Sequence, residues 1–374
     1  MKAIKLFALF TIILASACKK EDPPHPHPEN LEEAIENIIQ PMVDDKTTVG
    51  AAVGIIKPGG EKEMFFFGEK NKNRGNTPDE NTLFEIGSIN KTMTGAILAH
   101  MTLQEKVNLD DAVEDYLPGI ANFPDYQGQK IQFQHLANHT SSLPRLADNG
   151  NIHDIDQPFA NYSKQMMYEF LDDYTLPRPI GSEEEYSNLA FGLLGHTLGE
   201  INNSSFDYLL HTFIFDQLGM QNTYTYIPSG YDNIAQPHNR SRNATPMWDF
   251  SDVMLGAGGI KSSLKDMLLY LEANMGYGNS TLKEALAFSH ENTQMLHDPV
   301  GTGLAWVNAR RPVDNTTFTH HNGGTLGSIA FIGFIKELDV GVVLLFNCNI
   351  AERSGEPGIE ARKCVEIIEA MQNY

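Results

Sequence analysis

Ser88 and Lys91 are spaced so that a hydroxyl and an amine could carry out one chemical step together. Apolar residues recur at helical intervals from Ile89 to Met101, which predicts a helix that begins at or just after Ser88 and runs to about Glu105. Lys91 then lies one turn from Ser88, on the same face. A serine hydroxyl is a weak nucleophile unless a base or a positive charge lies within hydrogen-bond reach. Lys91 and the N-terminal end of the helix could supply both.

The Ser-x-x-Lys spacing also has a purely structural interpretation, because a serine that caps a helix is often followed by a solvated lysine. The same spacing recurs from Ser16 to Lys19 and from Ser262 to Lys265. The pair alone therefore does not identify a catalytic serine, and other motifs must decide.

Tyr186-Ser187-Asn188 stands at the start of a second predicted helix, which covers residues 187–200. A tyrosine beside a lysine can have its phenol pKa lowered, and it can then act as a base. Tyr-x-Asn also occurs at 231–233 and 277–279, but both of these copies lie in turn-like stretches.

His321-Asn322-Gly323-Gly324 is the third stretch that could carry chemistry. The glycines would let the backbone approach a substrate closely and offer an N–H group to a developing oxyanion. The structural alternative is a pair of edge-strand histidines, His320 and His321, beside a glycine turn.

Taken together, Ser-x-x-Lys, Tyr-Ser-Asn and His-x-Gly occur in the order that is typical of one enzyme group. The chain resembles the serine β-lactamase and penicillin-binding-protein superfamily, in particular its class C β-lactamase-related branch. The likeness covers roughly residues 30–374. Further similar segments are Phe84 to Lys91, Leu136 to Pro144, Leu218 to Met220 and Gly258 to Ser263.

The resemblance implies a role for each motif residue and places Ser262 in a structural segment. Ser88 would be the nucleophile, Lys91 would help to deprotonate it, and Tyr186 would pass the proton to the leaving group. Asn188 would orient Lys91 and the substrate amide. His321 and Gly323 would help to bind the substrate, and the N–H groups of Ser88 and Gly324 would form the oxyanion hole. No metal or other cofactor is needed.

Three departures from the family pattern bear on the substrate. His321 stands where β-lactamases and transpeptidases usually carry lysine, Ser142 replaces a glycine, and Glu183 to Glu185 precede Tyr186. The first and third predict weak binding of anionic antibiotics, and family members with histidine at this place include esterases and D-amino-acid peptidases. With an ordinary pKa of roughly 6.5, His321 would gain charge between pH 7.5 and 5.5, so that anionic substrates would bind better as the pH falls.

The elements that must position these residues follow from the apolar patterning. Strands at both ends with a helical middle predict an α+β fold, β-lactamase/transpeptidase-like, with an antiparallel sheet flanked by helices and an inserted helical region. The predicted helices also include 30–44, 163–173, 204–217, 263–274 and 358–371. The predicted strands are 49–56, 64–68, 303–309, 316–320, 328–335 and 340–347.

The first 29 residues read as an export segment and a tether. Residues 1–17 have the basic start and short apolar run of a signal peptide, and Leu14 to Cys18 resembles a bacterial lipobox, with Ala15 in place of the usual leucine. Ordinary cleavage near Ala17 is the alternative. Residues 18–29 are a proline-rich, lipid-anchored linker, and residues 30–374 form the hydrolase domain. Cys348 and Cys364 could pair in an exported protein.

The composition excludes one class of partner. The 374 residues carry a formal net charge of −21, which would repel phosphate backbones, so we expect no nucleic-acid binding. The sequence thus predicts an exported serine hydrolase, anchored to a bacterial membrane through Cys18, that acts on a small-molecule or peptide substrate. The bond cleaved would be an ester or an amide, as in an esterase or a D-amino-acid peptidase. The alternatives are a weak β-lactamase and a catalytically idle surface binding protein.

Overall fold

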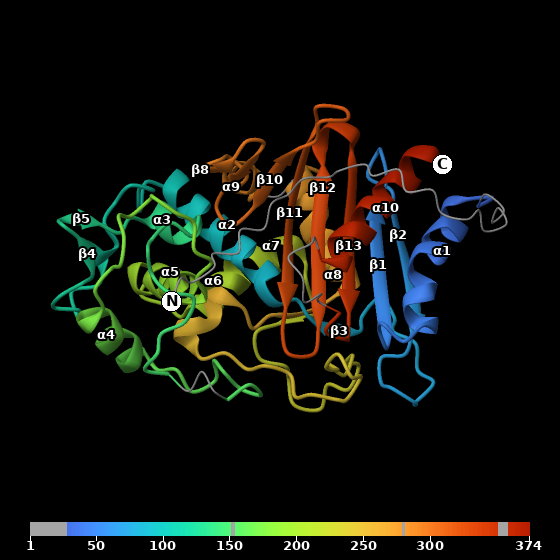
Figure 1. Ribbon diagram of the computed structural model, residues 1–374, viewed down its shortest axis with the longest axis horizontal. Coiled ribbons are helices and arrows are strands. Elements are labelled where there is room, and N and C mark those ends of the chain that lie inside the picture. Colours follow the sequence, from blue (N-terminus) through green and yellow to red (C-terminus); the bar gives the residue numbers. More distant parts are fainter. Residues whose placement is uncertain (1–27, 151–153, 279–280, 351–357) are drawn as a thin grey trace, which may run out of the picture.

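The computed structural model describes residues 28–150, 154–278, 281–350 and 358–374. Within these ranges an eight-stranded antiparallel sheet runs in the order β2-β1-β13-β12-β11-β10-β9-β8, which joins the two ends of the chain (Figure 1). Its strands are β1 (Gly50–Ile56), β2 (Lys62–Gly68), β8 (Gln294–His297), β9 (Val300–Thr302), β10 (Val307–Arg310), β11 (Thr317–Gly324), β12 (Ile329–Ile335) and β13 (Val340–Phe346).

Two layers of helix and a helical region surround this sheet. The helices are α1 (Leu31–Asp44), α2 (Asn90–Leu103), α3 (Phe133–Ala137), α4 (Lys164–Asp173), α5 (Asn188–Ile201), α6 (Phe206–Leu210), α7 (Asp216–Leu218), α8 (Leu264–Met275), α9 (Lys283–Ser289) and α10 (Ile359–Asn373). Short strands complete the description: β3 (Leu83–Glu85), β6 (Thr223–Tyr224) and β7 (Lys261–Ser263) form one small sheet, and β4 (Asp125–Tyr126) pairs with β5 (Gln129–Lys130).

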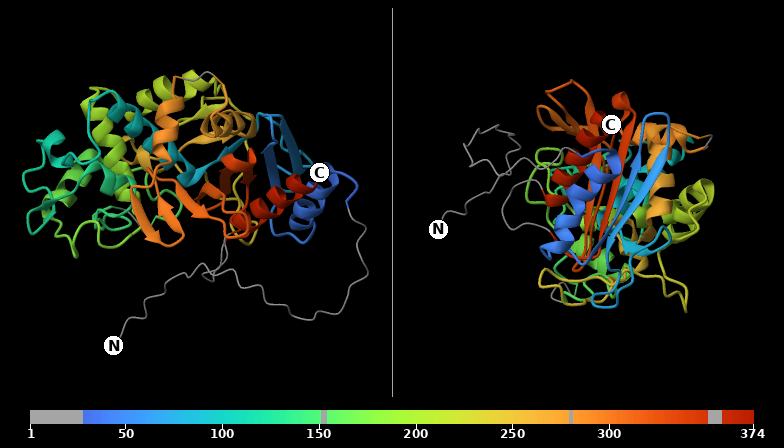
Figure 2. Two further views of the ribbon diagram at one scale, coloured as in Figure 1. Left: turned by 90° about the horizontal axis from the view of Figure 1, so that it is seen from above. Right: turned by 90° about the vertical axis from the view of Figure 1, so that its right-hand side faces the viewer.

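The central strands β1, β12 and β13 are apolar along their whole length and fully buried. Both of their faces are covered, which is why they do not alternate apolar and polar residues. One face packs against α1 and α10 and the other against α8, as the edge-on view in Figure 2 shows. The sheet is therefore a rigid wall, and β11 lies in it next to β12.

The other half of the molecule is helical and encloses α2. Of the residues in this helix, Asn90 to Ala99 are all buried, which is the pattern of a helix inside a core and not of an amphipathic surface helix. The neighbouring α5 is buried from Leu189 to Gly199 and packs against a 3₁₀ segment, Asp252–Ala257. The two buried helices pack against each other, and the N-terminal end of α2 lies toward the sheet (Figure 1).

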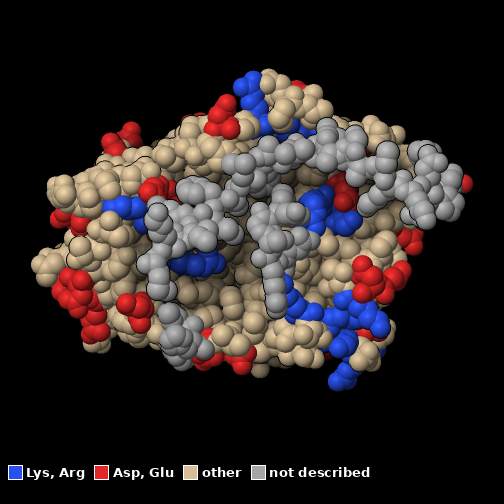
Figure 3. Space-filling view, viewed as in Figure 1, with Lys and Arg blue, Asp and Glu red and all other residues tan. Residues whose placement is uncertain are grey.

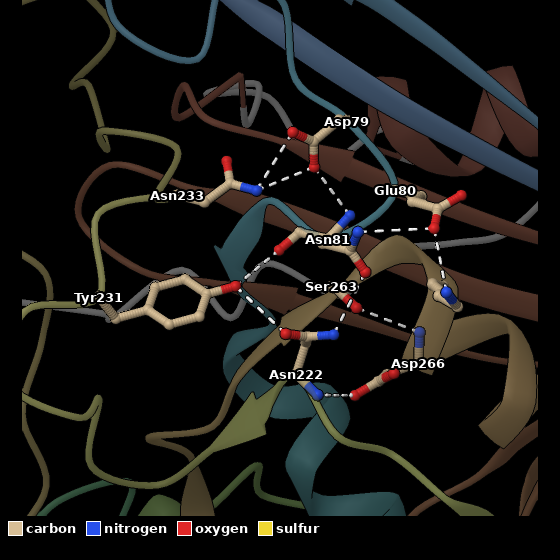
Figure 4. Close-up of polar contacts among 9 residues, drawn as sticks. Asp79, Glu80, Asn81, Asn222, Tyr231, Asn233, Ser263 and Asp266 are labelled. Carbon is tan, nitrogen blue, oxygen red and sulfur yellow. Dashed lines mark hydrogen bonds and ion pairs between the residues drawn. The ribbon is translucent and has the colours of Figure 1, made fainter.

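One competing copy of each motif, Ser262 to Lys265 and Tyr231 to Asn233, has structural contacts, whereas Ser16 to Lys19 and Asn279 lie outside the described residues. Ser262 lies in β7 and its hydroxyl contacts that of Thr223 at 2.7 Å, whereas Lys265 pairs with Glu80 on the surface. Tyr231 donates its hydroxyl to the carbonyl of Asn81 at 2.9 Å, in the polar cluster drawn in Figure 4. The copy at 231–233 therefore ties loops together.

The predicted elements were largely confirmed, and the exceptions have local causes. A π-helical turn, His211–Phe215, interrupts the helix expected at 204–217. The strand expected at 303–309 begins only at Val307, and β8, β9 and α9 were not predicted because they are short. Cys348 and Cys364 are buried free thiols, so they do not pair. Residues 1–27, which include Cys18, lie outside the described residues. Among the described helices, none is long and apolar enough to cross a membrane.

Candidate active site

Ser88 sits in a tight 3₁₀ turn, Gly87–Ile89, that leads directly into α2. The turn needs glycine at its first position, because Gly87 has φ +51° and a side chain there would meet the backbone nitrogen of Gly324 at 2.6 Å. Ser88 itself is only half-buried. Its hydroxyl is therefore held at the junction of α2 and β11 and stays accessible.

The first turns of α2 are bonded to the carbonyl groups of residues 255–258. The Asn90 side chain donates to the carbonyls of Leu255 and Gly258, the latter at 2.9 Å. The Thr94 hydroxyl donates to the carbonyl of Gly256 at 2.8 Å. The carbonyl of Ala257 accepts from Lys91. These bonds fix the start of the helix, and with it Ser88 and Lys91, against the neighbouring segment.

Lys91 is completely buried, and its amine has three partners within hydrogen-bond distance. Nζ lies 2.8 Å from Oδ1 of Asn188, 2.7 Å from the carbonyl oxygen of Ala257 and 3.1 Å from Oγ of Ser88. Burial lowers the pKa of Lys91 well below its ordinary value, and the positive charge of Arg145 lowers it further. The amine is thus driven toward its neutral form.

A neutral amine has two N–H donors and one lone pair, and the partners of Lys91 match that count. The oxygens of Asn188 and Ala257 can only accept, so they take the two N–H groups. The lone pair is left facing the Ser88 hydroxyl, which can donate to it. This arrangement places the lone pair of a neutral Lys91 where a general base for Ser88 would need it.

The Tyr186 ring is held beside Lys91 by His139. The two rings lie 4.3 Å apart between centroids, and Nδ1 of His139 accepts the N–H of Ser187 at 3.1 Å. The carbonyl of His139 accepts the N–H of Glu185 at 2.8 Å. Ser187 also caps α5, because its hydroxyl accepts the N–H of Ala190 at 2.9 Å. Tyr186 is therefore fixed on both sides along the chain.

The expectation of a lowered phenol pKa is wrong. Burial raises the pKa of Tyr186 to about 12, although a hydrogen bond with Ser88 and the charge of Arg145 act in the opposite direction. Lys91 lies 4.9 Å from the centre of the ring, but its neutral form supplies little positive charge to stabilise a phenolate. Tyr186 is thus a phenol at neutral pH, and it is suited to donate a proton.

Gly323 and Gly324 bring β11 into direct contact with the Ser88 turn. A methyl group on Gly323 would lie 1.9 Å from the carbonyl oxygen of Ile86 and 2.9 Å from the backbone nitrogen of Ser88. Only glycine permits this approach. The peptide groups of Ser88 and Gly324 thus belong to segments that touch, which is the arrangement that an oxyanion hole requires.

His321 lies on β11 and is 5% exposed. Burial is the main cause that lowers the pKa of His321 to about 3, and its Nδ1 lies 2.6 Å from the carbonyl oxygen of Asn322. The expectation that His321 gains charge between pH 7.5 and 5.5 is therefore wrong, because the ring stays neutral in that range. His321 does not replace the charge of a lysine.

Glu85 was not singled out in the sequence, yet it links the segments around the site. It is 3% exposed, and its carboxylate accepts the hydroxyl groups of Thr325 at 2.7 Å and Ser328 at 3.0 Å and the N–H of Trp248 at 2.7 Å. Burial raises the pKa of Glu85. Through these bonds it joins the strand before Ser88 to the turn after Gly324.

Arg145 and His139 are the other site residues that sequence reasoning missed. His139 lay within a segment that resembled the family, but no role was assigned to it, and Arg145 follows that segment directly. The guanidinium carbon of Arg145 lies 5.0 Å from the centre of the Tyr186 ring. Of the three glutamates before Tyr186, Glu185 pairs with Arg178 at 2.6 Å and the other two are exposed. No group of three or more His, Cys, Asp or Glu in the described ranges could hold a metal ion.

Comparison with solved structures gives the same fold. A class C β-lactamase superposes with a TM-score of 0.80 at 22% identity, covering 92% of this chain and 98% of the other. The D-alanine carboxypeptidase AmpC from Burkholderia cenocepacia gives a TM-score of 0.76 at 22% identity, covering 91% and 99%. The predicted fold class is thereby confirmed.

Comparison of sequences identifies relatives along most of the chain. A β-lactamase of Pseudomonas fluorescens is 24% identical over 363 residues, which are 86% of this chain and 94% of the relative. The D-alanyl-D-alanine-carboxypeptidase/endopeptidase AmpH of Escherichia coli strain K12 is 25% identical over 358 residues, 91% of each chain. The model of the β-lactamase family matches residues 35–365. Because this match spans nearly all of the folded chain, the protein belongs to the β-lactamase family.

Proposed function

We propose that this protein is a serine hydrolase that forms an acyl-enzyme at Ser88 and cleaves an ester or an amide, as an esterase or a D-amino-acid peptidase does. The observation that carries the proposal is the set of contacts around Lys91, whose lone pair is left for the Ser88 hydroxyl by two acceptors. A neutral, buried amine in this position is an activating base for a serine.

In the acylation step, Oγ of Ser88 attacks the substrate carbonyl and its proton passes to Nζ of Lys91. The bond to the leaving group breaks as Tyr186 donates its phenol proton to it, and Lys91 returns a proton to Tyr186. The raised pKa of Tyr186 supports this order, because the phenol carries its proton at neutral pH. The N–H groups of Ser88 and Gly324 stabilise the oxyanion.

In the deacylation step, water attacks the ester formed on Ser88 and gives a proton to the same pair of groups. The bond between the acyl carbon and Oγ of Ser88 then breaks, Oγ takes a proton back from that pair, and the acid product leaves. Asn188 keeps Lys91 in place through both steps, since it accepts one of the two N–H groups of the neutral amine. Gly323 contributes by allowing β11 to lie against the Ser88 turn.

The first test is covalent labelling followed by intact-mass measurement. A serine-reactive phosphonate should add one adduct to the wild-type protein. Ser88→Ala should abolish the adduct, whereas Ser262→Ala, which alters the competing Ser-x-x-Lys copy, should retain it. An adduct that persists in Ser88→Ala would contradict the assignment.

The second test is turnover of a chromogenic short-chain ester, a D-peptide and a cephalosporin. The relative named D-alanyl-D-alanine-carboxypeptidase/endopeptidase favours the peptide, and the relatives named β-lactamase favour weak hydrolysis of the cephalosporin as a second candidate. Absence of turnover and of a phosphonate adduct in the wild type would instead support an idle binding protein that uses His321, Gly323 and Gly324 to hold a ligand.

We further propose that residues 1–17 are a signal peptide, residues 18–29 a tether and residues 30–374 the hydrolase domain, which is exported and lipid-anchored at Cys18. Support comes from the small residues before Cys18 and the proline-rich stretch after it. Wild-type protein should partition with membranes and incorporate a labelled fatty acid, and Cys18→Ser should do neither. Unlabelled, freely soluble wild-type protein would rule out the anchor.

A further inference from the structure

Arg145 is fixed at the rim of the site by its backbone and not by its side chain. Its carbonyl accepts the N–H groups of Asn188 at 3.0 Å and Leu189 at 3.3 Å, in the first turn of α5. Asn188 in turn contacts Lys91. Because α5 is buried, these hydrogen bonds fix the backbone of Arg145 beside Ser88, Lys91 and Tyr186.

The guanidinium of Arg145 lies over the Tyr186 ring, 5.0 Å from its centre, and the residue is exposed. Its side chain forms no ion pair or hydrogen bond with any residue of the described ranges. An arginine that rests on an aromatic ring keeps its planar set of N–H donors, which matches the two oxygens of a carboxylate. The donors are thus both preorganised and available.

Other charged groups beside Tyr186 cannot serve the same purpose. Lys91 is buried, and its hydrogen-bonding capacity is used by Ser88, Asn188 and Ala257. His321 remains neutral above pH 5. On the face shown in Figure 3, basic side chains form several separate patches. An arginine side chain is charged at every physiological pH.

We propose that Arg145, and not His321, is the positive charge with which this site selects substrates that carry a carboxylate. The inference rests on the proposed acyl-enzyme function and names its substrate class as acidic esters or amides. The carboxylate can belong to the acyl portion or to the leaving group, and the experiment separates the two. Arg145 would bind the charge of the substrate and would not itself transfer a proton, while its charge also lowers the pKa of Lys91.

The experiment measures kcat/KM for two matched pairs of esters. The first pair, para-nitrophenyl butyrate and para-nitrophenyl hemiglutarate, differs by a carboxylate in the acyl portion. The second pair, phenyl acetate and meta-carboxyphenyl acetate, differs by a carboxylate in the leaving group. The ratio of acidic to neutral kcat/KM within each pair reports charge recognition, and it is insensitive to small changes in overall rate.

For Arg145→Gln we expect this ratio to fall about tenfold in one pair. This fold-change corresponds to a charge-assisted hydrogen bond at the weak end of its usual range, which we choose because Arg145 is exposed to solvent. Arg145→Lys should retain part of the preference. Arg74→Gln, which removes an exposed arginine from the loop after β2, should leave both the ratio and the neutral activity unchanged. A fall in the first pair places the carboxylate in the acyl portion, and a fall in the second places it in the leaving group.

Two results would overturn the inference. One is an unchanged ratio in both pairs for Arg145→Gln, with correct folding shown by an unaltered phosphonate adduct at Ser88. The other is a ratio of acidic to neutral kcat/KM that rises for the wild type as the pH falls from 8 to 5.5. Such a rise would indicate that a titrating histidine, His321, and not Arg145 binds the carboxylate. Failure of the proposed function looks different, since the wild type would then neither take the phosphonate nor cleave the neutral esters, and this outcome would overturn both proposals.

Discussion

Gly323→Ala should damage catalysis more than it damages stability. The added methyl group would lie 1.9 Å from the carbonyl oxygen of Ile86, and contacts of this kind are essentially never shorter than 3.0 Å. The atom in the way belongs to the backbone and cannot rotate aside, so β11 must move away from the Ser88 turn. A displacement of about 1 Å in a catalytic arrangement is enough to cost on the order of a hundredfold in rate.

The assay for this change is kcat on a neutral chromogenic ester, together with thermal unfolding. Overpacking should lower the free energy of unfolding by about 1 to 3 kcal/mol. Gly333→Ala is the matched control, because its methyl group would meet the Phe318 ring at 2.7 Å, elsewhere in the same sheet. The control should lose similar stability and keep its kcat.

The reasoning would be refuted if both Gly323→Ala and Gly333→Ala kept kcat within about threefold of the wild-type value. Contact between β11 and the Ser88 turn would then not be needed for catalysis, and the oxyanion hole would have to be formed by other groups. A large loss of kcat in both variants would instead indicate general damage to the sheet.

Two further predictions follow from the buried titratable groups. Asn188→Asp places a carboxylate where Oδ1 now lies 2.8 Å from Lys91, so the pKa of Lys91 should rise and the acidic limb of the pH profile of kcat/KM should move to higher pH. Asn188→Ala should lower the rate without moving that limb. If Asn188→Asp and the wild type gave identical pH profiles, the role of Lys91 as a base would be contradicted. His321 binds a proton near pH 6.5 when unfolded but near pH 3 when folded, so stability should fall as the pH drops below 6.5, by about 1.4 kcal/mol at pH 5.5. Urea unfolding of His321→Asn should show a correspondingly smaller loss between pH 7.5 and 5.5, and an equal loss in both proteins would count against the lowered pKa.

The sequence alone was sufficient for the features that depend on neighbours along the chain. The start of α2 just after Ser88, the start of α5 near Ser187 and the strands β1 and β2 all follow from local spacing and residue type. The order of the three motifs then identified the family and the fold, because each motif stands at one terminus of a helix or a strand. These inferences needed no knowledge of which segments touch.

Only the tertiary structure decided the protonation states and the partners of the reactive groups. Burial determines that Lys91 tends toward its neutral form, that Tyr186 keeps its proton and that His321 does not titrate near neutral pH, and burial results from packing across the whole chain. The place of Arg145 over the Tyr186 ring depends likewise on the contact between residue 145 and α5. Residue types and spacing show which groups could react, but the free energy of a charge depends on what surrounds it in space.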